Sequence, residues 1–133
     1  MLSHPKIGAS FEGYVVEEVL RAIKPDAAYF WATHTGAELD LLLFRGRRRY
    51  GIEIKFQDAP HMTPSMRIAL EDLSLEGITI LYPGALRYAL AEQVEVVPVA
   101  ELAAAGPDIL IPGAGRRSAL LSGMRRKAAR RRP

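Results

Sequence analysis

The chain has 133 residues, of which 49% are hydrophobic and 25% charged, with no cysteine and a net charge of +3. This length and composition predict one globular domain, and they exclude a disordered or collagen-like chain, disulfide bonds, thiolate catalysis and cysteine-ligated zinc. No apolar run reaches the ~18–20 residues of a membrane span, and the N-terminus lacks the apolar core of a signal peptide, so we expect a cytoplasmic protein without a membrane partner.

The charge is divided unevenly along the chain. Residues 106–133 carry eight Arg or Lys against one acid, a net charge of +7, whereas the preceding residues hold ten bases and fourteen acids, a net charge of −4. Glycine and proline punctuate the beginning of the basic segment. The expected organisation is therefore a folded domain over residues 1–105 and a basic tail over residues 106–133 that lies outside the core.

The first predicted element is an amphipathic helix over Ile7–Ile23, in which apolar residues recur at helical spacing and Pro25 follows as a stop signal. Glu12 falls within the apolar arc of this helix, which predicts a carboxylate buried against the surface that the helix covers. A buried charge is costly unless a partner or a cation accompanies it. Glu12 is therefore a candidate functional residue, and the alternative is a carboxylate that reaches water from the helix end.

A meander of three strands is predicted next, over Ala27–His34, Glu38–Arg45 and Arg48–Phe56. Gly46 and Arg47 form a two-residue turn between the second and third strands, and glycine at the first central position suits type II′. Tyr29 and Trp31 share one face of the first strand, where we expect them in the core or in an interface rather than as a platform for stacked bases.

Helices and strands are predicted to alternate in the rest of the domain. They are a helix over Pro64–Glu76, a buried strand over Ile78–Tyr82, a short helical turn over Leu86–Ala91, a strand over Val94–Val97 and a helical end over Val99–Ala105. A buried strand that follows a helix implies a crossover onto the sheet. The fold class is therefore α/β, with a mixed sheet flanked by helices.

Acidic side chains interrupt two strands of the meander. Asp40 stands in an otherwise apolar strand, and Glu53, Lys55 and Gln57 alternate with apolar residues on the next one. With the predicted turn, Asp40 lies directly across from Glu53, about 4.5–5.5 Å away at Cβ. Two like charges at this distance indicate a positive group between them, either Lys55 or a divalent cation. Hard oxygen ligands select Mg²⁺ or Mn²⁺. Glu12 would add a third carboxylate to the two ligands on the strands.

This constellation resembles a known group of enzymes. Glu12, Asp40 and the triplet Glu53-Ile54-Lys55 resemble the Asp…(Asp/Glu)-x-Lys signature of the PD-(D/E)xK nuclease superfamily, whose restriction-endonuclease-like fold has an αβββαβ core. Within that superfamily, the chain from about Ser3 to Leu102 is similar to the uncharacterised C-terminal domain that follows the ATPase module of many AAA+ ATPases. Leu39 stands where a proline is usual, and the chain has no Gly-x-x-x-x-Gly-Lys-(Ser/Thr) phosphate loop.

The resemblance implies metal-dependent hydrolysis of phosphodiester bonds in DNA. The implied ligands of Mg²⁺ or Mn²⁺ are Asp40, Glu53 and the backbone carbonyl of Ile54. Lys55 would orient the attacking water and stabilise the charge of the transition state. Glu12 would bind a second metal or position water, and Gln57 would steady the site.

Two basic clusters are predicted to contact the phosphates of nucleic acid. The first cluster lies at the hairpin tip and comprises Arg47, Arg48 and Arg49, next to Arg45. The second lies in the tail and comprises Arg125, Arg126, Lys127, Arg130 and Arg131, for which a solvated, unstructured segment is the alternative. The small folded domain has a small footprint on a duplex, so we expect a homodimer.

Three functions remain open at this point. The first is a DNA nuclease, and the second is a non-catalytic nuclease-like module that binds nucleic acid or protein as an accessory to an AAA+ ATPase partner. The third is a toxin–antitoxin or defence-system component, which the sequence does not separate from the first. The simplest alternative is that Glu53 and Lys55 have no functional role and belong to the solvent-exposed face of an edge strand. His4, His34 and His61 lack the spacing of metal ligands, so we expect them at the surface.

Overall fold

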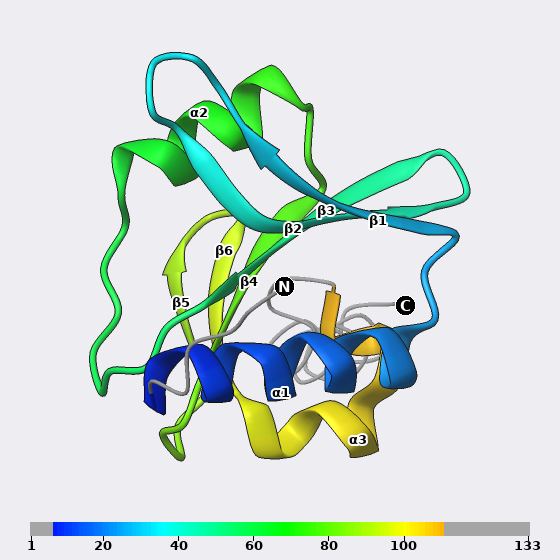
Figure 1. The fold of residues 1–133 in the computed structure, drawn as a ribbon, viewed down its shortest axis with the longest axis vertical. Coiled ribbons are helices and arrows are strands. Elements are labelled where there is room, and N and C mark those ends of the chain that lie inside the picture. The colour runs from blue at the N-terminus through cyan, green and yellow to red at the C-terminus, as the bar shows by residue number, and fades with distance from the viewer. Residues whose placement is uncertain (1–6, 111–133) are drawn as a thin grey trace, which may run out of the picture.

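Six strands form one mixed sheet in the order β1-β2-β3-β4-β6-β5, with helices on both faces (Figure 1). The structure is a computed structural model, and it describes residues 7–110. In chain order the elements are α1 (Ile7–Ile23), β1 (Ala27–Ala32), β2 (Glu38–Arg45), β3 (Arg48–Ile54), α2 (Pro64–Asp72), β4 (Gly77–Tyr82), β5 (Tyr88–Ala91), β6 (Val94–Pro98), η1 (Val99–Glu101), α3 (Leu102–Ala105) and η2 (Gly106–Leu110). The predicted mixed α/β class is confirmed.

The sheet combines an antiparallel and a parallel part. Strands β1, β2 and β3 form the predicted antiparallel meander, whereas β4 pairs in parallel with both β3 and β6. The predicted hairpin turn is also confirmed, since Arg45 pairs with Arg48 and Gly46 has φ +62°. The parallel pairing of β3 with β4 requires a crossover, and the crossover carries α2.

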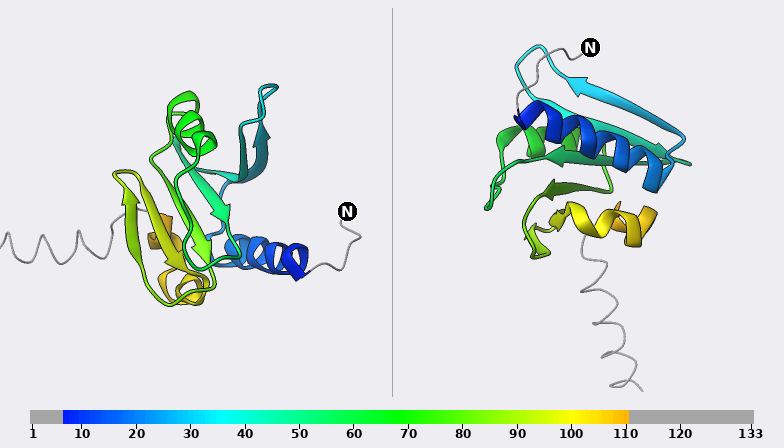
Figure 2. Two further views of the ribbon diagram at one scale, coloured as in Figure 1. Left: turned by 90° about the vertical axis from the view of Figure 1, so that its left-hand side faces the viewer. Right: turned by 60° about the horizontal axis from the view of Figure 1, so that its bottom comes forward.

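Helices α1 and α3 lie on one face of the sheet and α2 lies on the other (Figures 1 and 2). Val15, Val19 and Ile23 anchor α1 in the first core layer. Met66 and Ala69 anchor α2 in the second. The α2 layer approaches β3 closely at Gly51, where an added Cβ would stand 3.0 Å from Ile78 Cγ1. Among the described helices, none is long and apolar enough to cross a membrane.

The helical turn predicted over Leu86–Ala91 is wrong, because Tyr88–Ala91 forms strand β5. Strand β5 pairs antiparallel with β6, which would otherwise be the open edge of the sheet. The loop before it is fixed by the Tyr82 hydroxyl, which donates to the Leu86 carbonyl at 2.6 Å and accepts from the Leu86 N–H at 3.1 Å. A tertiary hydrogen-bonding opportunity therefore overrides the local helical preference of this segment.

The prediction that the chain leaves the core at Gly106 is also wrong for the described residues that follow it. Residues Gly106–Leu110 form the 3₁₀ helix η2, in which Ile109 and Leu110 are buried. The Thr79 hydroxyl on β4 donates to the Ile109 carbonyl at 3.2 Å and secures this segment. The glycine and proline at 106 and 107 shape a tight turn that returns two large apolar side chains to the α1 layer.

We expect Ile109→Val to lower the free energy of unfolding by about 1 kcal/mol, because it removes one buried methyl group. Urea denaturation measures this change, and Ile68→Val on the exposed side of α2 is the matched control. Equal stability of the two variants would show that η2 does not contribute to the core.

Candidate functional site

Strands β2 and β3 separate at the position where Asp40 and Glu53 face each other. The pairing between them runs from Arg45 opposite Arg48 to Leu41 opposite Ile52, which is the predicted register. Beyond that point β3 continues to pair with β4, since Glu53 lies opposite Ile80. The two carboxylates therefore occupy the fork between two diverging strands.

The carboxylates take the place of the missing backbone ladder in this fork. Asp40 Oδ2 accepts a hydrogen bond from the Ile54 N–H at 2.8 Å, and Glu53 Oε2 accepts one from the Asp40 N–H at 3.3 Å. Each side chain is thus held by the backbone of the opposite strand. This reciprocal arrangement leaves Asp40 Oδ1 and Glu53 Oε1 outside these backbone bonds.

Glu53 is buried at 7% exposure, whereas Lys55 reaches the surface from the same strand. Lys55 Nζ lies 3.9 Å from Glu53 Oε1. Burial, as the largest cause, and the negative charge of Asp40 together raise the pKa of Glu53 to about 8, against an opposite effect of Lys55. The positive charge of Lys55 does not offset the two effects that disfavour the ionised carboxylate, so the fork favours an additional cation or a proton.

Glu12 is exposed, so the predicted burial of its carboxylate is wrong. Glu12 is flanked by Phe11, which is half-buried and packs against the core, and by exposed Gly13 and Tyr14. The ring of Phe11 lies 5.0 Å from that of Phe56. The pKa of Glu12 is nevertheless raised, first by partial loss of hydration and second by the charge of Asp40, against an opposite effect of Lys55. Glu12 therefore contributes to the electrostatics of the fork from its open side.

The fork opens into a pocket with a volume of about 310 Å³, lined by Gly36, Glu38, Asp40, Glu53, Lys55, Thr63 and Ser65. The sequence prediction missed three polar members of this lining. Glu38 shares a strand face with Asp40 by the period of two, which is a signal that could have revealed it. Thr63 and Ser65 come from the start of α2, where Ser65 Oγ accepts from the Glu38 N–H at 3.3 Å. Their approach to β2 depends on the crossover and has no sequence signal.

The donor set of the fork fits a hard divalent cation. Within residues 7–110, no group of three or more His, Asp or Glu side chains is placed to hold a metal ion, so the fork offers two carboxylates and no third. The Ile54 N–H points toward Asp40, and the carbonyl of a strand residue points to the same side as its N–H. Two carboxylates and this carbonyl match the way Mg²⁺ binds, through one or two carboxylates together with water and substrate oxygens.

Comparison with known proteins places the chain in a family. The model of the family described as "Domain of unknown function (DUF4143)" matches residues 7–102. The chain belongs to the DUF4143 family. Two uncharacterized proteins, of Mycobacterium bovis and Mycobacterium tuberculosis, are each 42% identical to it over 103 residues, which is 77% of this chain and 23% of theirs. The chain thus spans less than a quarter of the length of these curated relatives. No solved structure matches it.

Some predicted residues lie away from the pocket of this DUF4143 domain. Strand β3 ends at Ile54, so the alternation does not continue to Gln57, whose exposed side chain donates to the Ala59 carbonyl at 3.5 Å. The prediction that Gln57 steadies the carboxylates therefore has no support in the geometry. Arg47, Arg48 and Arg49 are exposed at the hairpin, at the far end of β2 and β3 from the fork. The predicted tail cluster, Arg125, Arg126, Lys127, Arg130 and Arg131, lies outside the described residues.

Proposed function

We propose that this DUF4143 domain is a metal-dependent nuclease that hydrolyses phosphodiester bonds of DNA, with Mg²⁺ or Mn²⁺ bound in the fork between β2 and β3. The observation that carries this proposal is the pair formed by buried Glu53 and half-buried Asp40, which line a polar pocket together with Lys55. Two carboxylates withdrawn from water beside one lysine lower the stability of the fold unless a positive ligand joins them. Such a cost is characteristic of a functional site.

The order of elements supports the same proposal. From α1 to β4 the chain follows the sequence helix, three strands, helix, strand, which is the αβββαβ order of the restriction-endonuclease-like fold. The carboxylates lie on the second and third strands, as the proposed relationship to PD-(D/E)xK nucleases requires. We therefore include that fold relationship in the proposal.

The two carboxylates of the fork, the Ile54 carbonyl, Lys55 and Glu12 have proposed tasks. Asp40, Glu53 and the Ile54 carbonyl hold the cation. A bound divalent cation supplies positive charge that polarises the phosphate and acidifies water. Lys55 projects its ammonium group into the pocket, where it orients the attacking water and stabilises negative charge on the phosphate oxygens. Glu12, at the open side, would bind a second metal or position water.

Cation binding tests the proposal directly. We expect the protein to bind Mn²⁺ in calorimetry and to cleave DNA with Mg²⁺ or Mn²⁺ but not with EDTA. Asp40→Asn should weaken Mn²⁺ binding about tenfold or more, because it removes one of two charged ligands while the amide oxygen still accepts the Ile54 N–H. Asp72→Asn on the exposed end of α2 is the matched control. Equal Mn²⁺ affinity of the two variants would contradict the proposed metal site.

The length of the relatives favours a second candidate function. Because the chain covers 23% of each relative, the domain also suits the role of a non-catalytic accessory to a larger protein such as an AAA+ ATPase. In that case the fork would bind no cation, and the isolated protein would not cleave DNA under any metal condition. Association with an ATPase, without Mn²⁺ binding, would support this second function.

A further inference from the structure

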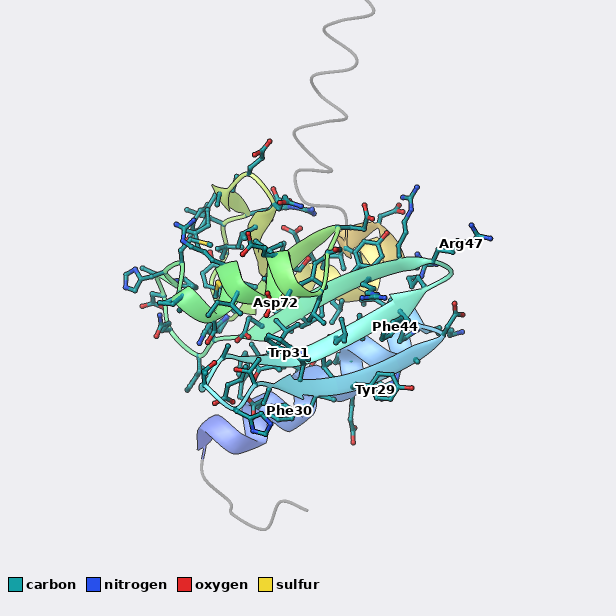
Figure 3. All side chains as sticks on the ribbon, turned by 90° about the horizontal axis from the view of Figure 1, so that it is seen from above. Tyr29, Phe30, Trp31, Phe44, Arg47 and Asp72 are labelled. Carbon is teal, nitrogen blue, oxygen red and sulfur yellow. The ribbon has the colours of Figure 1, made fainter. Side chains whose placement is uncertain are left out.

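Three aromatic side chains of β1 and β2 lie on the face of the sheet that carries α2, beside that helix. Figure 3 shows Tyr29, Trp31 and Phe44 on this part of the sheet, seen from the α2 side. Trp31 and Phe44 pack against the core layer of α2 from its margin. The ring of Tyr29 meets the ring of Phe44 edge-on at 5.8 Å. We call this surface the aromatic face.

The aromatic face is only partly covered. Tyr29 is 58% exposed and therefore lies outside the core, one of the two places expected for it, whereas Trp31 and Phe44 are half-buried. Strand β1 is an edge strand, and within the described residues no element continues the sheet beyond it. The side chains of residues 27–33 carry no charge, which leaves this edge without the protection that lysine or proline gives to exposed strands.

The aromatic face continues into a positively charged hairpin. All charged residues between Leu41 and Arg49 are arginines, and Arg45, Arg47 and Arg48 project exposed from the turn. The guanidinium carbon of Arg49 lies 5.6 Å from the centroid of the Phe44 ring. Arginine and aromatic rings are thus interleaved on one surface, and the exposed arginines favour a polyanion over a second copy of the chain as its partner.

One end of the aromatic face lies at the arginine hairpin, and strand β2 leads from there to the pocket. Strand β2 passes from the carboxylate fork at Asp40 to the arginine hairpin at Arg45, a separation of five residues or about 17 Å at the usual rise. Phe44 and its neighbour Tyr29 lie near the hairpin end of this path. A flexible polyanion bound at the hairpin would therefore extend along the face toward the pocket.

We propose that the aromatic face binds single-stranded nucleic acid, with bases stacked on Tyr29 and Phe44 and phosphates paired with the hairpin arginines. Exposed rings stack on the faces of unpaired bases, whereas a duplex keeps those faces covered and presents only the edges of its bases. The inference rests on the proposed function in one respect only, since it names an unpaired strand as the substrate that reaches the pocket. Binding itself requires neither Asp40 nor a cation.

Trp31 provides a probe of this surface because it is the only tryptophan in the chain. We expect oligo(dT) or oligo(rU) to quench the fluorescence of Trp31 in EDTA, where cleavage is blocked. A comparison of the quenching by the two oligonucleotides shows whether the surface prefers DNA or RNA. Fluorescence anisotropy of labelled oligonucleotides gives the affinity. Salt at ~0.2 M weakens only the part of the affinity that comes from phosphate contacts, including any contribution of the basic tail. The part that comes from base stacking then remains.

Two variants and two matched controls test the assignment in the full chain. Tyr29→Ala should weaken binding of single strands about fivefold or more, in keeping with the loss of one stacked base. Tyr14→Ala on α1 removes a tyrosine of nearly equal exposure, 56%, and should leave binding unchanged. Arg47→Ala should weaken binding and reduce its salt dependence, whereas Arg67→Ala on the exposed side of α2 should not.

Several outcomes would overturn the inference. They are equal affinity for duplex and single strand, equal losses in Tyr29→Ala and Tyr14→Ala, unchanged Trp31 fluorescence on saturation, and a change of oligomeric state in Tyr29→Ala, which would identify the face as a contact between copies. Failure of the proposed nuclease function would look different. In that case the single strand would still bind and quench Trp31, but added Mn²⁺ would neither bind nor lead to cleavage.

Discussion

Lys55→Ala should lower the rate of Mg²⁺-dependent DNA cleavage by about 100- to 1,000-fold, the usual effect of removing one group that stabilises transition-state charge. Lys55 lines the pocket, with Nζ 3.9 Å from Glu53 Oε1, where its charge would reach a phosphate bound over the carboxylates. Cleavage of plasmid or single-stranded DNA, followed on gels over time, measures the change.

Cation binding separates this role of Lys55 from a structural one. The ammonium group competes with a cation for Glu53, so Lys55→Ala should keep or strengthen Mn²⁺ binding while it loses cleavage. Arg67→Ala is the control for the loss of one positive charge at an exposed position. Cleavage at the rate of the unsubstituted protein would remove Lys55 from the proposed chemistry, whatever the metal affinity.

Glu53→Gln should remove a pH dependence from the stability of the metal-free protein. Burial and Asp40 raise the pKa of Glu53 from 4.5 to about 8 in the folded state, so between these values the folded chain holds a proton that the unfolded chain releases. The stability due to this proton is complete below about pH 4.5 and is lost as the pH rises through about 8. We expect the free energy of unfolding to fall by about 4 kcal/mol over this interval.

Urea denaturation in EDTA at pH values from 5 to 8.5 measures this dependence. Glu53→Gln should be nearly insensitive to pH in this range, whereas Glu17→Gln on the exposed side of α1 should follow the unsubstituted protein. Added Mg²⁺ should stabilise the unsubstituted protein more at pH 8 than at pH 6, because the cation binds the ionised carboxylate. A flat stability profile of the unsubstituted protein would contradict the raised pKa.

The part of the site that is local in sequence could be predicted. The turn at Gly46 sets the hairpin register, and the register alone brings Asp40 opposite Glu53. The fork between the strands was not predictable, because it depends on the pairing of β3 with β4 continuing where the pairing with β2 stops. The hydrogen bonds between the carboxylates and the opposite backbones follow from that fork and carry no signal in the sequence.

The other differences between the predicted and the observed site arise where tertiary contacts decide whether a side chain is buried. Glu12 has the helical phase of a buried residue, but the layer around it is incomplete, since Phe11 is only half-buried and Gly13 and Tyr14 are exposed. Tyr29 has the chemistry of a core residue, but α2 covers only part of its face of the sheet. In both cases periodicity gives the direction of a side chain, and the extent of the neighbouring layer decides whether that side chain is buried.

The crossover that carries α2 has a consequence for the order of folding. Asp40 and Glu53 lie in one hairpin, whose closure needs only a two-residue turn, whereas Thr63 and Ser65 reach the pocket after β4 pairs in parallel with β3. Short loops close faster than long ones, and parallel pairings are slow. We therefore expect the carboxylates to meet early, as part of a local nucleus, and the wall of the pocket to form later. A divalent cation present during refolding would then act on the hairpin first and speed the folding reaction as well as stabilise its product.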